Sequence, residues 1–152
     1  CDERYTDIIK SFKDGIISRL YEMNIFLNPV IESYERINAT FRTADKSWSE
    51  RLTSEAILVD SRSNIQLTSP DMQANPYIAL SLIIKSALDH DDSVNDDRVQ
   101  QLSSMDISIP SSYKSALDVA RASKFLKSAL PDDILNPFFY IKYAQYEESI
   151  SD

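Results

Sequence analysis

Residues that give a backbone flexibility or supply catalytic groups are scarce in this sequence. Its 152 residues include one glycine, one cysteine, one histidine and one tryptophan, whereas average usage would give about ten glycines. This scarcity excludes a P-loop, a dinucleotide-binding fingerprint and a kinase glycine-rich loop, because each needs glycine where the backbone approaches phosphate. A Ser-His-Asp triad would have only His90 as its base, and a zinc site of His and Cys ligands cannot be assembled.

Positive charge and long apolar runs are also lacking. Sixteen basic residues against twenty-four acidic ones give a net charge of −8 at pH 7, so we expect no nucleic-acid partner. We expect no membrane partner, because no apolar run approaches the length of about 20 residues that crosses a bilayer. The single cysteine suits a reducing, cytoplasmic setting. Because the sequence begins at Cys1, we expect a piece of a longer chain, with a lipid-modified Cys1 as the alternative.

Apolar residues spaced three and four apart predict an amphipathic helix from Thr6 to about Asn24. Three Asn-Pro pairs predict further helix starts, because Asn caps a helix and Pro suits its first position; they are Asn28-Pro29, Asn75-Pro76 and Asn136-Pro137. Ser112 is a predicted cap for one or two helices up to residue 130, and a weaker helix is expected over 94–102. The helix after Asn75-Pro76 is expected to bury one broad apolar face, formed by Tyr77, Leu80, Ile83, Ile84, Ala87 and Leu88.

The spacing of the apolar residues changes to a period of two between residues 41 and 69. Residues 55–60 and 64–69 read as two short strands joined by a turn over 61–63. Alternation along the second strand places Asn64, Gln66 and Thr68 on one face and apolar side chains on the other. The expected fold is one α+β domain over residues 1–152, mostly helical, with a helical cluster packed on a small antiparallel hairpin.

Four stretches occur in the order and spacing of one known family. The segment LNPVIESYERI ends near residue 37, and SPDMQANPYIALSLIIKSALD follows from residue 69. SYKSALDVARASKFLKSAL and IKYAQYEES complete the series near the end of the sequence. Together they resemble the C-terminal part of the glutamine synthetase catalytic domain, including its Asn-Pro helix starts and its Ser-Pro-Asp turn.

The resemblance implies a definite chemistry for the parent enzymes. Glutamine synthetases phosphorylate the side-chain carboxylate of glutamate with ATP, and ammonia then displaces the phosphate. This reaction uses Mg or Mn ions held by carboxylates, and guanidinium groups that neutralise the transferred phosphoryl group. Several family metal ligands lie in an upstream half that has no counterpart in these 152 residues, so we expect no cofactor and no metal site for this chain alone.

The positions that resemble the family's reactive face are mostly neutral here. By position, Asn64, Gln66 and Thr68 stand where the family presents an Arg, a metal-ligating Glu and a second Arg. Thr53 and Leu58 stand at two further positions where the family carries Arg. An amide lacks the charge that a hard divalent cation prefers, and neither Asn nor Thr forms the bidentate contacts of Arg. We therefore expect a degenerate active site with no catalytic residue.

Two arginines are predicted to retain substrate contacts. Arg36 follows Ser-Tyr as the glutamate-binding Arg of the family does, and Arg51 keeps its charge near the family's nucleotide and phosphate positions. The alternative for Arg36 is a surface pair with Glu32, one helical turn earlier. A calcium site in the acidic stretch from Asp89 to Asp97 is disfavoured, because it lacks the central Gly and terminal Glu of an EF-hand loop.

Three functions remain open. The first is a non-catalytic glutamine synthetase-like region that serves as a scaffold or interaction module. The second is the C-terminal part of an active ATP-dependent ligase joining glutamate to ammonia or another amine, and the third is an unrelated acidic helical adaptor. Aromatic residues between Phe138 and Tyr146 exceed what one helix face can bury, so we expect protein partners: missing segments of a parent chain, or neighbouring subunits in a homo-oligomer.

Overall fold

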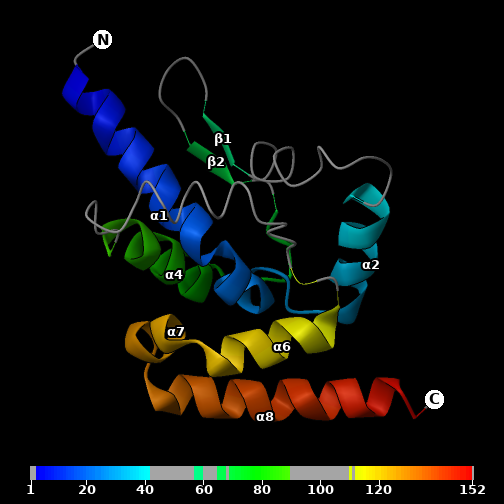
Figure 1. Cartoon of the computed structure of the whole chain (residues 1–152). Helices are drawn as coiled ribbons and strands as arrows, with labels where there is room; N and C mark the ends of the chain where they lie inside the picture. The colour runs from blue at the N-terminus through cyan, green and yellow to red at the C-terminus, as the bar shows by residue number, and fades with distance from the viewer. Residues whose placement is uncertain are drawn as a thin grey trace.

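Helices make up most of the structure, a computed structural model that describes residues 3–41, 57–59, 65–67, 69–89, 110 and 112–151 (Figure 1). The helices are α1 (Glu3–Leu27), α2 (Ile31–Phe41), α4 (Pro76–Leu88), α6 (Tyr113–Ala122), α7 (Lys124–Ala129) and α8 (Asp132–Ser149). Two short strands, β1 (Ile57–Val59) and β2 (Ile65–Leu67), form an antiparallel pair. The predicted class, a mostly helical α+β fold with one small hairpin, is confirmed.

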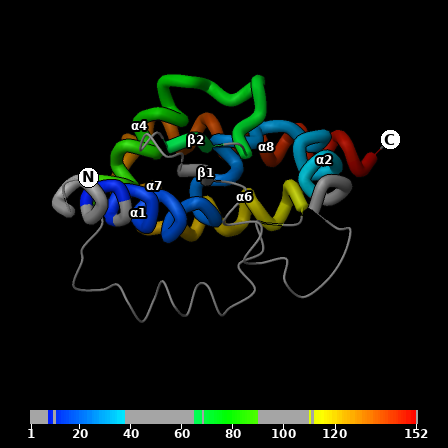
Figure 2. Tube along the Cα trace, turned by 90° about the horizontal axis from the view of Figure 1, so that it is seen from above, coloured from blue at the N-terminus to red at the C-terminus, as the bar shows by residue number. Residues whose placement is uncertain are grey.

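Helix α1 is the central element of the packing. It contacts α4 on one side and α6 and α7 on another, while α8 lies against the far side of α6 (Figure 1). Viewed from above, α4 and the N-terminal half of α1 lie at one end of the molecule and α2 lies at the other (Figure 2). Elements from the two ends of the sequence therefore share one core.

The core is built from the apolar stripe predicted for the first helix. Ile16, Leu20 and Met23 are buried, and the stripe continues to Leu27 because α1 runs three residues beyond Asn24. The partners of this stripe are fully buried residues of the three neighbouring helices: Leu82 of α4, Leu117 of α6 and Leu126 of α7. Burying a Leu or Met side chain contributes roughly 1.5–3 kcal/mol.

Helix α4 buries only part of the predicted face: Ala87 is buried and Ile83 packs against the core cluster. Its buried residues are Ala79, Leu82, Ser86 and Ala87, whereas Tyr77, Leu80, Ile84 and Leu88 are exposed. The sequence pattern could not select a face because α4 is apolar on nearly all sides. Three of the four buried residues of α4 are small, and α4 packs on α1.

The three Asn-Pro pairs do not all start helices. Asn75 caps α4 as predicted, with its side-chain oxygen accepting from the backbone N–H groups of Tyr77 and Ile78. Helix α2 begins at Ile31, and the N–H of Asn28 instead donates to the Asn24 carbonyl at the end of α1. Asn28 is therefore not the cap of α2.

The prediction that Asn136-Pro137 opens the last helix is also wrong. Helix α8 begins at Asp132, and Pro137 lies inside it. Two factors favour the earlier start. Asp132 and Asp133 suit the positive N-terminal end of the helix dipole, and Leu135 anchors this first turn by its burial. The Ser112 cap and the two helices after it are as predicted, and the expected helix over 94–102 lies outside the described residues.

Most of the aromatic residues near the C-terminus pack inward. Phe138 stacks on Phe26 with ring centroids 4.2 Å apart, and Phe139 meets the same ring edge-on at 6.3 Å. Tyr146 stacks on Tyr113 at 6.3 Å. Tyr140 differs from these, because 79% of its surface is exposed. Core packing thus accounts for most of this aromatic set.

Candidate functional site

Strand β2 of the hairpin presents one of its three side chains to solvent. Gln66 is exposed, whereas Ile65 and Leu67 on either side are half-buried against the core cluster. The predicted alternation along this strand is confirmed for these three residues. Leu58 of β1 is the partner of Gln66 in the antiparallel register. Two of the predicted degenerate positions therefore lie side by side. Arg51, Thr53, Asn64 and Thr68 lie outside the described residues.

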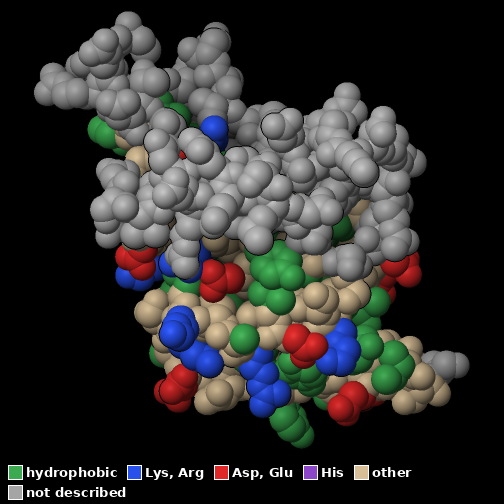
Figure 3. Space-filling view, viewed as in Figure 1, with side chains coloured by type: hydrophobic (Ala, Val, Ile, Leu, Met, Phe, Trp, Pro, Cys, Tyr) green, Lys and Arg blue, Asp and Glu red, His purple; other side chains and the backbone are tan. Residues whose placement is uncertain are grey.

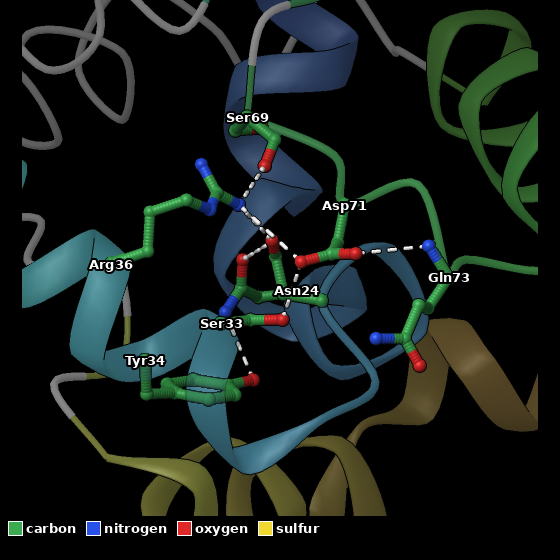
Figure 4. A network of polar contacts seen from close by, with 8 residues as sticks. Asn24, Ser33, Tyr34, Arg36, Ser69, Asp71 and Gln73 are labelled. Carbon is green, nitrogen blue, oxygen red and sulfur yellow. Dashed lines mark hydrogen bonds and ion pairs between the residues drawn. The ribbon is translucent and has the colours of Figure 1, made fainter.

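A network of polar side chains lies beside the hairpin, where the end of α1, helix α2 and the segment after β2 meet (Figure 4). Asp71 is its acidic centre. One carboxylate oxygen, Oδ2, accepts from the Ser33 hydroxyl at 2.8 Å, and Oδ1 accepts from the backbone N–H of Gln73 at 2.9 Å. The Asp71 N–H donates to the Leu27 carbonyl at 2.8 Å. Asp71 therefore joins its own loop to both α1 and α2.

Arg36 is the cationic partner in this network. Its Nη2 donates to Asn28 Oδ1 at 3.0 Å and to the Ser69 carbonyl at 3.3 Å, and lies 3.9 Å from Asp71 Oδ2. The contacts described for the guanidinium all use Nη2, while 45% of the side chain is exposed. None of the described contacts joins Arg36 to Glu32, so the structure does not form the surface pair that we gave as the alternative.

Neighbouring groups shift the acidity of Asp71. The backbone N–H of Gln73 lowers its pKa below the ordinary value, and the Ser33 hydroxyl and the positive charge of Arg36 act in the same direction. Partial burial raises the pKa of Asp71, but by less than these groups lower it. The carboxylate form is therefore the one that the network favours.

A second line of hydrogen bonds runs inward from Asn28. Its Nδ2 donates to Asn24 Oδ1 at 2.9 Å, and Asn24 Nδ2 donates in turn to the Tyr34 hydroxyl at 3.2 Å. Asn24 and Asn28 are both fully buried, so these bonds satisfy amides that water cannot reach. Burial is the main reason that the pKa of Tyr34 is raised well above its ordinary value, and the phenol stays protonated.

The network collects the motif residues from which the family resemblance was drawn. Asn28, Ser33 and Arg36 come from the first stretch, and Ser69 and Asp71 come from the second. Asn24 was predicted only as the end of the first helix. Its spacing of four residues from Asn28 could have indicated a side-chain pair on one helix face.

Within the part of the chain that the structure describes, no group of three or more His, Cys, Asp or Glu side chains is placed to hold a metal ion. Gln66 offers a neutral amide and Leu58 offers no ligand atom, so these two residues do not fit a divalent cation. None of the described helices is long and apolar enough to span a membrane.

Comparison with known proteins agrees with the motifs. The profile of the glutamine synthetase catalytic domain matches residues 2–151, nearly the whole chain. The chain belongs to the glutamine synthetase catalytic-domain family. It is 28% identical to the glutamine synthetase of Methanosarcina mazei, with 88% of this chain and 34% of the relative aligned. The Pyrococcus furiosus enzyme is 26% identical over 96% of this chain and 37% of its own length. The Staphylococcus epidermidis enzyme is 25% identical over 96% of this chain and 36% of its own length.

The chain thus spans about a third of the length of the curated glutamine synthetases that it matches. Glutamine synthetases use ATP and divalent metal ions. In this member of the family, the described motif residues form the network around Asp71, and exposed Gln66 is paired in the register with Leu58.

Proposed function

We propose that this chain is a glutamine synthetase-like region that is not catalytic by itself and serves as a scaffold or interaction module. One observation carries the proposal: Gln66 is exposed on β2, and its partner in the register is Leu58. The family resemblance implies a metal-ligating Glu and an Arg at these two positions. Replacing them with an amide and an alkyl group removes one negative and one positive charge from the face on which phosphoryl transfer depends.

The contacts around Asp71 support the scaffold part of the proposal. Asp71 receives hydrogen bonds from Ser33 and Gln73, and the Arg36 guanidinium lies beside it. These contacts join α1, α2 and the segment before α4, so they hold the fold whether or not a substrate binds. Arg36 and Arg51 stay predicted substrate contacts, which rest on the resemblance alone.

The second candidate is the C-terminal part of an active ATP-dependent glutamate ligase. It is supported by the curated relatives, which are named glutamine synthetases and are about three times as long as this chain. In that case the metal ligands come from other parts of a longer polypeptide. The Arg36 side chain is 45% exposed, so it remains available to a carboxylate substrate.

Both candidates have protein partners in the cytoplasm, either further segments of a parent chain or neighbouring subunits of a homo-oligomer. Neither involves nucleic acid or a membrane. The net charge of −8 would repel phosphate backbones and anionic lipid surfaces alike.

The two candidates are separated by assaying the complete native polypeptide that contains these residues. The assay measures ADP release and γ-glutamyl product with ATP, Mg ions, glutamate and ammonia or hydroxylamine. We expect no product, and no product from an Arg36→Ala variant either. Glutamate-dependent ADP release together with product formation, lost in the Arg36→Ala variant, would overturn the proposal in favour of the active ligase.

A further inference from the structure

Helix α4 has an apolar stripe on its surface that the described structure leaves uncovered. The stripe consists of Tyr77, Leu80, Ile84 and Leu88, each between 50% and 81% exposed. These residues follow one another at steps of three, four and four, so at 3.6 residues per turn they occupy one side of the helix, within an arc of about 80°. Leu88 lies 11 positions after Tyr77, which makes the stripe about 16 Å long at a rise of 1.5 Å per residue.

The stripe lies opposite the side of α4 that packs on the core. Ala79, Leu82 and Ser86 are buried on that side, and their positions lie about half a turn of the helix away from the centre of the stripe. A helix that is apolar all round is normally buried all round. The composition of α4 is therefore that of a helix with partners on both sides, and the described structure covers only one of them.

The stripe also differs from other helical surfaces of the molecule in its charge. Lys85 is the one charged residue in the sequence of α4, and it pairs with Asp89 at 2.9 Å. In contrast, Lys, Arg, Asp and Glu side chains are interspersed with apolar ones over the surface formed by α6, α7 and α8 (Figure 3). The stripe offers no charge to a partner, so the partner must present an uncharged apolar surface of its own.

A lipid membrane does not suit the stripe. Helices that lie on a membrane surface carry several Lys or Arg residues on their polar side, which attract anionic headgroups. Helix α4 has one such residue, Lys85, and Asp89 neutralises it. The net charge of −8 on the chain would in addition repel an anionic bilayer. These charges favour a protein surface as the partner.

A second copy of the chain presents a surface that matches. With two α4 helices antiparallel about a twofold axis, Leu80 of one copy faces Ile84 of the other, and Tyr77 lies near Leu88. Each large apolar side chain then meets another, and no like charges face each other, as a self-complementary twofold interface requires. The antiparallel arrangement also brings the opposite ends of the two helix dipoles together, and it places Asp89 near the positive N-terminal end of the other α4.

The area of the stripe is sufficient for a weak dimer. Large side chains offer roughly 150–200 Å² when fully exposed, so the four partly exposed ones offer about 450 Å² in each copy. Pairing two stripes removes about 900 Å² from water, and the adjoining exposed residues Pro76 and Ser81 bring the total to about 1,000 Å², the lower limit for a specific interface. An interface of this size is consistent with a dissociation constant in the micromolar range.

We propose that the chain forms a homodimer in which the α4 stripes of two copies pack against each other in antiparallel orientation. The inference rests on the proposed function, because a full-length ligase has further segments with which to cover α4. It adds to that function a partner and a surface: the module assembles with itself through a helix that carries neither of the predicted substrate contacts.

The test is sedimentation equilibrium of the complete native polypeptide over concentrations from about 1 to 200 µM. We expect the mass to rise toward twice that of the monomer. Ile84→Glu should raise the dissociation constant at least about tenfold, because it places a charge inside the apolar contact. Ile141→Glu is the matched control, since Ile141 of α8 is 51% exposed and Ile84 is 50% exposed, and it should leave the dissociation constant unchanged.

Two further measurements test the fold of the variants and the orientation of the helices. Circular dichroism checks that the Glu variants fold, and Leu88→Glu, at the more exposed end of the stripe, replaces Ile84→Glu if that variant does not. In a Cys1→Ser background, oxidation should cross-link two copies through Ser81→Cys, near the twofold axis, but not through Gln73→Cys, beyond the end of the stripe. Cross-linking at both positions would indicate parallel helices and contradict the proposed arrangement.

The proposal is overturned by a monomer at every concentration, by a dimer that withstands Ile84→Glu, or by equal effects of the two Glu variants. A monomer in which Ile84→Glu lowers the urea midpoint would assign the stripe to another segment of the same chain. A monomer that binds phosphatidylcholine vesicles, with the binding lost in Ile84→Glu, would assign it to a membrane. These results are separate from the ligase assay: an inactive monomer overturns the dimer alone, whereas ligase activity overturns the proposed function.

Discussion

Arg36 and Asn28 are joined by a hydrogen bond of 3.0 Å from the guanidinium Nη2 to the side-chain oxygen of the amide. The same nitrogen reaches the carbonyl of Ser69, 33 residues further along the chain. One guanidinium thus ties the end of α1 to α2 and to the segment that leaves β2. The buried amide of Asn28 depends on it, since its other hydrogen bond is donated inward to Asn24.

Arg36→Ala should therefore destabilise the protein. The variant removes two hydrogen bonds from a charged donor, and because the side chain is only half-exposed we expect a loss of about 1–2 kcal/mol in the free energy of unfolding. Urea denaturation measures the change. Lys85→Ala, which removes an exposed ion pair between residues four apart, is the matched control and should cost a few tenths of a kcal/mol. Equal losses in the two variants would contradict the role given to Arg36.

Asp71 should make stability depend on acid pH. Its pKa is lower in the folded protein than its ordinary value of 3.8, mainly because the Gln73 N–H donates to it. Because the pKa of Asp71 is lower in the folded protein, its carboxylate adds to the free energy of unfolding at pH values above 3.8, the ordinary pKa. This contribution is lost as the pH falls through the pKa of the folded protein. Comparing urea unfolding of the wild type and Asp71→Asn should show their difference in stability at pH 6 and its decline below about pH 4. A difference that stays constant with pH would contradict this assignment.

Tyr34→Phe tests the inner part of the network. The change removes the acceptor for Asn24 Nδ2 in a fully buried position, and an unsatisfied buried donor costs about 1–3 kcal/mol. Tyr77→Phe, at a ring that is 81% exposed, should leave the denaturation midpoint unchanged. If the two variants unfold at the same urea concentration, the Asn24–Tyr34 bond contributes nothing.

Pro137→Ala should stabilise the protein rather than weaken it. Pro137 lies inside α8 and cannot donate to the carbonyl of Asp133, four residues earlier. Alanine restores this hydrogen bond and removes the clash of the ring, so we expect a gain of about 1 kcal/mol or more in the free energy of unfolding. Thermal unfolding followed by circular dichroism measures it. A lower melting temperature would show that the proline ring makes packing contacts that outweigh its cost to the helix.

The sequence predicted the elements better than the faces and ends of the helices. The period of two between residues 41 and 69 was enough to find the hairpin and its alternation at Gln66, because one strand face is polar and the other apolar. The buried face of α4 was missed because Leu80 and Leu82 are equally apolar, and only packing against α1 distinguishes them. The start of α8 was missed because Asn136-Pro137 is a strong local signal that the burial of Leu135 overrides.

The candidate site was only partly predictable for a related reason. Arg36 was identified from its motif, but its contacts with Ser69 and Asp71 join segments more than thirty residues apart. Spacing along one helix could suggest only Glu32 as a partner.

The position of α1 has a consequence for the order of folding. This helix precedes its packing partners in the sequence, since it packs against α4, α6 and α7, and Glu22 accepts a hydrogen bond from Ser123, 101 residues later. Forming contacts between such distant residues requires closing long loops. The chain loses conformational entropy in closing them before the contacts stabilise it, and this slows folding. Until α6 and α7 leave the ribosome, the apolar stripe from Ile16 to Leu27 has only α4 among its three main partners. During that interval, we expect the exposed part of the stripe to make the nascent chain prone to aggregation.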